Sequence, residues 1–337
     1  MTVVVTGAAG FIGAHVARAL VARGESVVGV DNLNDYYDVA LKQARLTKLL
    51  PNAGFTFHKA DIADRAAIGE IFARYPDATR VVHLAAQAGV RYSMIDPYAY
   101  VASNVMGHVV MLEAARSLRR LDHFVFASSS SVYGLNQAMP FAEDDRVDTP
   151  VSLYAATKRA DELIGHAYAH LYGMPQTGLR FFTVYGPWGR PDMAYYSFAR
   201  AIVAGEPITL YDGGETRRDF TYIDDIVAGV IGALDALPAA RDPVRLLNIG
   251  NNRSESVATL VALLEEGLDR RAEIRFAPRP LADVAETTAS IDRMAALTGF
   301  APRTPLAEGI RRFVLWFCGY HGVGGKAAGG LLEARSR

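Results

Sequence analysis

Short runs of β-branched and aromatic residues alternate along the first part of the chain with longer stretches in which apolar residues recur at helical spacing. The short runs predict strands at residues 3–6, 26–30, 55–58, 80–84 and 123–127. Between them, the segments 11–24 and 104–118 predict amphipathic helices, and Gly24 ends the first of these. This alternation predicts an α/β fold built on a doubly wound parallel sheet, with crossover helices on both faces.

The pattern becomes less regular after about residue 180. Gly186, Pro187, Gly189 and Pro191 crowd one loop, and further Pro and Gly residues interrupt 205–214 and 278–280. We therefore predict a large domain at 1–180, to which a strand and a helix return from about 224–250, and a smaller mixed α/β C-terminal lobe at 181–321. The run GVGGKAAGG indicates a flexible tail at 322–337.

Composition narrows the classes of protein that this chain could represent. In 337 residues, 50% are hydrophobic, and 35 basic residues balance 36 acidic ones, so no basic surface for nucleic acid is expected. No apolar run approaches the roughly 20 residues that span a bilayer, and MTVVVTG carries no basic leader. The single cysteine, Cys318, is expected to be a core thiol in a reducing compartment. These features predict a cytoplasmic protein that binds neither nucleic acid nor membrane.

A glycine-rich segment follows the first predicted strand and opens the first predicted helix. In TGAAGFIG, Gly7, Gly10 and Gly13 allow the backbone to approach a pyrophosphate, which the helix N-terminus attracts. Asp31 ends the second predicted strand, where its carboxylate could accept hydrogen bonds from an adenosine ribose and repel a 2′-phosphate. The pattern therefore favours NAD over NADP as cofactor. The alternative for Asp31 is that it only caps the turn in DNLND.

Tyr154 and Lys158 stand four positions apart in SLYAATK and share one face of a predicted helix. Such a pair can arise by chance on any helix surface. Beside a nicotinamide, however, the lysine ammonium would favour the phenolate form of the tyrosine, which could then take a proton from an alcohol. Ser129, in ASSSSVYG after the fifth predicted strand, could hydrogen-bond the reacting oxygen. We predict these three residues as the catalytic set.

Taken together, these motifs resemble those of the extended short-chain dehydrogenase/reductase family over residues 1 to about 320. Within it, DNLNDYYD, AGVRYSMIDPYAYVASN, SSSSVYG, TGLRFFTVYGPWGRPDMA and RRDFTYIDDIV are similar to motifs of the UDP-glucuronate 4-epimerases. The resemblance implies a Rossmann domain with tightly held NAD, a UDP-sugar lobe and no metal. It also implies a homodimer packed through helices near 98–118 and 153–172. The implied further cofactor contacts are Phe11, Ile12, Asn32, Asp61, Ile62, Leu84, Ala85, Ala86 and Asn104.

The implied reaction inverts C4 of the sugar through a transient 4-ketone. With a uronic acid this ketone is a β-keto acid that can lose its carboxylate as carbon dioxide. We hypothesise that Ser130, Ser131 and Thr183, with Arg190 nearby, hold the carboxylate near the ketone plane and prevent that loss. Arg190 could alternatively serve only to order its proline-rich loop.

Two further arginines are predicted to bind the substrate. Arg91 and Arg218 lie in motifs of the resemblance, and Arg218 is the expected diphosphate ligand unless it merely pairs with Asp219 at the surface. Where the family usually has Pro-Gly-Asp, this chain has Leu281, Ala282 and Asp283, so a phosphate-facing loop could differ, and Arg279 has no assigned role.

Three rival functions remain at this point. A related dehydratase or decarboxylase would place an acidic residue where Ser130 and Ser131 stand, so its base is missing. A 4-epimerase for another UDP-hexose is disfavoured by Thr183 beside Arg190. A dinucleotide sensor without catalysis would have no need of Ser129, Tyr154 and Lys158.

Overall fold

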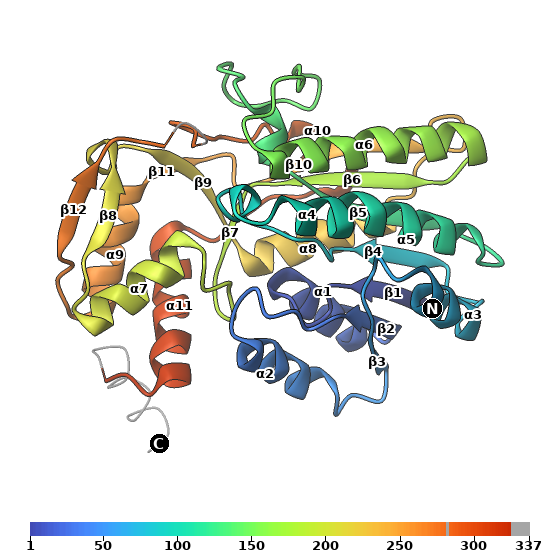
Figure 1. Ribbon diagram of the computed structural model, residues 1–337, viewed down its shortest axis with the longest axis horizontal. Helices are drawn as coiled ribbons and strands as arrows, with labels where there is room; N and C mark the ends of the chain where they lie inside the picture. The colour runs from blue at the N-terminus through green and yellow to red at the C-terminus, as the bar shows by residue number, and fades with distance from the viewer. Residues whose placement is uncertain (281–282, 325–337) are drawn as a thin grey trace.

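The structure is a computed structural model that describes residues 1–280 and 283–324. Its centre is a seven-stranded, all-parallel sheet in the order β10-β6-β5-β4-β1-β2-β3 (Figure 1). The strands are β1 (Thr2–Thr6), β2 (Ser26–Asp31), β3 (Phe55–Lys59), β4 (Arg80–His83), β5 (His123–Ser129), β6 (Gln176–Phe181) and β10 (Val244–Ile249). The five strands predicted from the first part of the sequence are all present, with ends shifted by at most two residues.

Helices cover both faces of this sheet because alternate strand residues point to opposite sides. Val3 and Val5 of β1 join one hydrophobic core, whereas Val4 joins the other. The first core contains α1 (Phe11–Ala22), α2 (Val39–Leu49) and α8 (Ile223–Asp235), and the second contains α3 (Arg65–Arg74) and α5 (Gly107–Arg116). The long α6 (Leu153–Tyr172) packs on β5 and beside α5. The predicted doubly wound sheet is therefore confirmed.

One predicted helix differs from its sequence pattern. The segment 104–118 was expected to be one amphipathic helix, but it begins inside a π-helical stretch, η2 (Val101–Met106), which continues from α4 (Pro97–Tyr100) into α5. The π-helical stretch holds Asn104 in the interior, where its side chain bonds both backbone groups of Gln87. Side-chain periodicity alone does not distinguish one wider turn from an α-helix.

The second lobe consists of smaller sheets and the helices packed on them (left of Figure 1). β11-β9-β7 form a three-stranded sheet and β12-β8 a two-stranded one. Its strands are β7 (Thr183–Tyr185), β8 (Ile208–Tyr211), β9 (Arg217–Tyr222), β11 (Ser254–Ser256) and β12 (Ile274–Ala277). Its helices are α7 (Ala194–Ala204), α9 (Val257–Leu268) and α11 (Leu306–His321), whereas α10 (Asp292–Thr298) packs on α8 and β10.

The chain crosses between the lobes more than once, because α8 and β10 return to the large sheet after β7 to β9. Short 3-10 turns, η1 (Tyr92–Met94), η3 (Ser130–Tyr133) and η4 (Asp212–Gly214), complete the connections. Cys318 is buried in α11, as expected of a core thiol. Within the described residues, no helix is both long and apolar enough to cross a membrane. Leu281, Ala282 and the predicted tail from residue 325 onward lie outside the described residues.

Candidate active site

A cavity lies at the carboxyl ends of the central strands and extends to the second lobe. In a parallel sheet of this kind, ligands bind at the carboxyl edge, where the connecting loops converge. The predicted residues that line the cavity are Gly7, Gly10, Phe11, Ile12, Gly13, Asp31, Asn32, Ile62, Leu84, Ala85, Ala86, Ser129, Ser130, Ser131, Tyr154, Lys158, Thr183, Arg190 and Arg218. The glycine-rich loop and the serine run therefore face one space, although over a hundred residues separate them.

Three predicted site residues lie outside that lining. Asn104 is buried and bonds Gln87 and Thr157, so it supports the cavity wall from behind. Asp61 accepts a hydrogen bond from Asn32 and caps its own turn at Ala63. Arg91 lies at the entrance, where its guanidinium is 3.7 Å from the carboxylate of Asp283.

The glycine-rich loop is packed too closely for larger residues. Gly7 has a φ of 71°, which favours glycine, and a Cβ there would lie 2.9 Å from the backbone nitrogen of Ala85. A Cβ on Gly13 would lie 2.0 Å from the carbonyl oxygen of Gly7. The N-cap of α1, Gly10, has no side chain to satisfy the first amides, which leaves them available for an anion. These residues fit the pyrophosphate of a dinucleotide.

Asp31 does cap the turn that follows it, which was the alternative to a role in cofactor binding, but capping is not its only contact. Its Oδ1 accepts the backbone N–H of Leu33 at 2.9 Å, so it does cap the following turn, and its Oδ2 accepts the N–H of Ala9 at 3.1 Å. The carboxylate thus ties the glycine-rich loop to the loop after β2. It also lines the cavity, so capping the turn does not remove it from the cofactor side.

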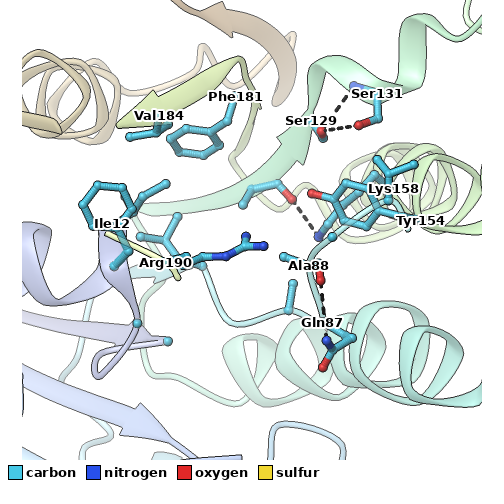
Figure 2. Close-up of a pocket in the computed structure, with 18 of the residues that line it drawn as sticks. Ile12, Gln87, Ala88, Ser129, Ser131, Tyr154, Lys158, Phe181, Val184 and Arg190 are labelled. Carbon is cyan, nitrogen blue, oxygen red and sulfur yellow. Dashed lines mark hydrogen bonds between the residues drawn. The ribbon is translucent and has the colours of Figure 1, made fainter. Parts of the chain in front are cut away.

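Tyr154 and Lys158 lie in the first turns of α6, whose N-cap Ser152 accepts the N–H of Ala155. The Lys158 ammonium donates to the Ala127 carbonyl and to Asp161, both at 3.0 Å. One of its three protons therefore remains for the cavity side. Figure 2 shows Tyr154 and Lys158 on one side of the cavity, with Ser129 close by. The Ser129 hydroxyl is 2.9 Å from that of Ser131 and accepts its backbone N–H.

Burial keeps the two histidines near Lys158 neutral, whereas the carboxyl group of Asp161 pairs with the Lys158 ammonium. Burial, with a smaller contribution from Lys158, lowers the pKa of His83 to about 3, and it lowers the pKa of His108 well below its ordinary value. Burial also raises the pKa of Asp161 to about 6, although Lys158 opposes that change. Lys158, on the same helix, and Arg190 are cations near Tyr154, and a neighbouring cation favours a phenolate.

Arg190 extends from its loop toward the side of the cavity where Tyr154 lies (Figure 2). Its guanidinium binds the carboxylate of Asp192, with a Nε–Oδ1 distance of 3.0 Å. Burial alone would lower the pKa of Arg190, but Asp192 more than compensates and the pKa is raised. Tyr36, from the loop after β2, donates its hydroxyl proton to the same carboxylate at 3.1 Å.

Arg218 does not pair with Asp219, so that alternative was wrong. Its guanidinium donates to Asp283 at 2.7 Å, at the end of the cavity lined by Asp283 and Thr287. Asp219 is buried and accepts the backbone N–H groups of Asn251, Asn252 and Ala289 instead. A carboxylate that holds two separate backbone segments is a structural group, and Arg218 is left to face the cavity.

Sequence reasoning gave no role to several residues that shape this site. Arg45 on α2 is one of them, although the sequence contains a pattern that indicates a buried role for it. Residues 41, 42, 45, 46 and 49 share one helix face, and Leu41, Leu46 and Leu49 mark that face as buried. Charged residues at such positions indicate a specific partner in the interior. By contrast, no sequence signal connected Asp192 to Tyr36 or Asp283 to Arg218.

The fold and the site together define an NAD-dependent enzyme of the short-chain dehydrogenase/reductase type. A family profile matches residues 3–250, and the chain belongs to the NAD dependent epimerase/dehydratase family. UDP-glucuronate 4-epimerase 3 of Arabidopsis thaliana is 48% identical over 340 residues, which cover 97% of this chain and 79% of that protein.

Solved structures of UDP-sugar 4-epimerases are also similar to this chain. The UDP-glucuronic acid 4-epimerase of Bacillus cereus, solved with UDP-glucuronic acid and NAD, superposes with a TM-score of 0.88 at 33% identity, covering 95% of this chain and 100% of that one. A UDP-glucose 4-epimerase of Thermotoga maritima, solved with UDP-glucose, has a TM-score of 0.85 at 30% identity and the same coverage. The predicted family, fold class and NAD cofactor are confirmed.

Proposed function

We propose that the protein interconverts UDP-glucuronate and UDP-galacturonate by inverting C4 of the sugar. The observation that carries this proposal is the position of Arg190. It brings a half-buried cation to the cavity wall that also holds Ser130, Ser131 and Thr183, beside Tyr154 and Lys158. A neutral hexose offers such a cation only hydroxyl acceptors, whereas a uronic acid offers a carboxylate, which makes the stronger charge-assisted hydrogen bond. The relatives named as UDP-glucuronate 4-epimerases support this choice of substrate.

Tyr154 is the proposed base for the 4-hydroxyl. Lys158 stabilises the phenolate through its charge, and Ser129 hydrogen-bonds the reacting oxygen as it becomes a ketone. Bound NAD would accept the hydrogen from C4 as hydride and return it to the opposite face of the ketone. Gly7, Gly10, Gly13 and Asp31 would hold this cofactor, with the other predicted cofactor residues around it.

The sugar must turn over between the two half-reactions, so we propose that the UDP moiety supplies most of the binding energy. Arg218 and Arg91 would bind the diphosphate. Both now contact Asp283, whose carboxylate occupies the position of an anionic partner. The diphosphate would take over these arginines from Asp283 when substrate enters.

The 4-ketone of a uronic acid loses its carboxylate most easily when the breaking C5–C6 bond lies perpendicular to the carbonyl plane. We propose that Ser130, Ser131, Thr183 and Arg190 hold the carboxylate near that plane, so that the bond overlaps the carbonyl poorly. The serines are also the reason why a decarboxylase is disfavoured, because that position holds no carboxylate.

We further propose that the protein is a homodimer. Large apolar side chains are exposed on and beside α4 and on α6, which contact one another along one side of the molecule (Figure 1). Tyr98 is 83% exposed, Ile95 75% and Leu163 56%. A patch of this kind is typical of a protein interface.

The single cysteine, which is free and buried, supports a location in the reducing cytoplasm.

The test is one incubation of the purified protein with UDP-glucuronate, after its bound NAD has been quantified. Chromatography should resolve UDP-galacturonate as the main product, with little UDP-pentose. Tyr154→Phe should lower kcat about 10²–10⁴-fold, because a positioned acid–base group typically contributes that much. A neutral UDP-hexose turned over faster than UDP-glucuronate would instead identify an epimerase for neutral sugars, and no turnover with NAD bound would favour a sensor.

A further inference from the structure

Arg45, on α2, is a buried cation with 3% exposure that holds three separate loops together. Its Nη1 donates to the carbonyl of Ala9 at 3.0 Å and to the hydroxyl of Tyr37 at 2.7 Å. Its Nε and Nη2 donate to the carbonyl of Trp188 at 2.9 and 2.6 Å, and Nη2 also reaches the carbonyl of Gly189 at 3.0 Å. All these acceptors are uncharged, and no carboxylate pairs with Arg45 in the described part of the chain.

Each of these loops carries part of the site. Ala9 belongs to the glycine-rich loop, Tyr37 to the loop after β2, and Trp188 and Gly189 directly precede Arg190. Buried charges are costly unless their partners are fixed, so such an arrangement is retained where it orders the backbone. A planar guanidinium suits this task because its donors point in set directions.

The segment before Arg190 is strained and needs such support. Trp188 has a φ of 63°, a left-handed conformation that is unfavourable for a bulky residue. Its ring packs against Trp316 and Tyr320 of α11, and its carbonyl receives two hydrogen bonds from Arg45. Gly189 leaves no room for a side chain, because a Cβ there would lie 1.6 Å from the hydroxyl of Tyr195. The backbone leading to Arg190 is therefore held on both sides.

A second contact joins the same loops on the cavity side. Tyr36 is the neighbour of Tyr37, and its hydroxyl donates to Asp192, which in turn binds Arg190. The loop after β2 is thus linked to the Arg190 loop at two points, by Tyr37 through Arg45 and by Tyr36 through Asp192. Both contacts place Arg190 relative to the loop that begins at Asp31.

We infer that Arg45 is a positioning residue that fixes the Arg190 loop against the cofactor loops and thereby sets how often the 4-keto intermediate loses its carboxylate. The inference rests on the proposed function, in which Arg190 holds that carboxylate. Loss of the carboxylate breaks the C5–C6 bond, releases carbon dioxide and leaves an enolate that takes a proton at C5. The orientation of the carboxylate decides the rate of this side reaction, and a displacement of about 1 Å can change a rate about 10²-fold.

The experiment compares Arg45→Lys with Arg18→Lys, both loaded with NAD and incubated with UDP-glucuronate. Arg18 is exposed on α1 and serves as the matched control. The readout is the ratio of UDP-pentose and 4-keto-pentose products to UDP-galacturonate, which does not depend on the fraction of folded enzyme. Lysine keeps the charge but cannot reach all the acceptors, so this ratio should rise about 10- to 100-fold. The control should keep the wild-type ratio.

A second variant covers the case in which Arg45→Lys does not fold. Tyr37→Phe removes one acceptor of Arg45 and should raise the same ratio by a smaller factor, with binding of UDP alone unchanged. An unchanged product ratio in either folded variant would overturn the inference, even if stability or kcat fell. Failure of the wild-type protein to convert UDP-glucuronate would instead refute the proposed function, so the two failures are distinguishable.

Discussion

Two arginines share the carboxylate of Glu162, and they differ in burial. Arg180 binds it through two hydrogen bonds of 2.8 and 3.0 Å, and Arg159 binds it through one of 3.0 Å. The side chain of Arg180 is 1% exposed and that of Arg159 is 27% exposed, while Glu162 is 0% exposed. Replacing each arginine by methionine removes the same charge and the same ion-pair partner. The two variants differ in the burial of the lost arginine and in the number of hydrogen bonds that it makes.

We expect very different losses of stability. Breaking a buried pair costs about 3–5 kcal/mol, and in Arg180→Met only the partly exposed Arg159 remains as partner of Glu162, whereas a pair in contact with solvent contributes about 0–1 kcal/mol. Arg180→Met also removes donors to Tyr133 and to the carbonyl of Glu143. With an unfolding entropy of about 2.1 cal/mol/K per residue, about 1 kcal/mol corresponds to roughly 1.4 °C in Tm for a chain of 337 residues, so Arg180→Met should lower Tm by at least about 4 °C and Arg159→Met by less than about 1.5 °C.

The assay is thermal and urea unfolding of both variants with saturating NAD, so that differences in cofactor content do not contribute. Parallel slopes in urea would establish that the two denatured states are comparable. Because Glu162 also accepts the hydroxyl of Ser128 at 2.6 Å, next to Ser129, Arg180→Met should lower kcat as well. Equal losses of stability in the two variants would refute the reasoning, since burial would then not decide the strength of the pair.

Three further outcomes follow from the same structure. Gly13→Ala should abolish NAD retention, because its Cβ would meet Gly7, whereas Gly69→Ala, which points to open space, should raise stability by about 0.5–1 kcal/mol in urea unfolding. His83 is neutral in the fold but charged when unfolded below pH 6.5, so the unfolding free energy should fall as pH decreases from 6.5 toward 3, by up to about 1.4 kcal/mol per pH unit, and His83→Gln should lessen this slope. Asp31→Ser should shift cofactor preference from NAD toward NADP in equilibrium binding, because the charge that repels a 2′-phosphate is removed.

Local sequence patterns were sufficient to predict the strands of the large sheet and many of the residues that line the site. Strand residues such as Val3 to Val5 are apolar without interruption because both faces are covered, and that is visible in the sequence. Gly7, Asp31 and Ser129 stand at or just after the ends of predicted parallel strands, and such strand ends meet at one edge of a sheet. The grouping of these residues follows from the topology of a parallel sheet and needs no knowledge of which residues contact one another.

Contacts between distant loops could not be predicted in this way. Arg45 meets the carbonyls of Trp188 and Gly189 across a sequence separation of more than 140 residues, and backbone carbonyls leave no signature in a sequence. The pairing of Arg218 with Asp283 depends on how strand β9 meets a distant loop of the second lobe. The neighbouring Asp219 was the obvious partner by position, but β9 turns its side chain inward, away from Arg218.

The arginines proposed to bind substrate each have a carboxylate of the protein as partner before substrate enters. Arg218 is held by Asp283, and Arg190 is held by Asp192. An entering diphosphate or uronate therefore exchanges one ion pair for another instead of neutralising a free cation, and the net electrostatic gain is smaller than the number of contacts would indicate. For the sugar this is an advantage, because a carboxylate bound too tightly by Arg190 would prevent the ring from turning over. Under the proposed function, Asp192 would compete with the sugar carboxylate for Arg190 and so allow the ring to be released, while Arg45 would keep the Arg190 loop in place to receive it again.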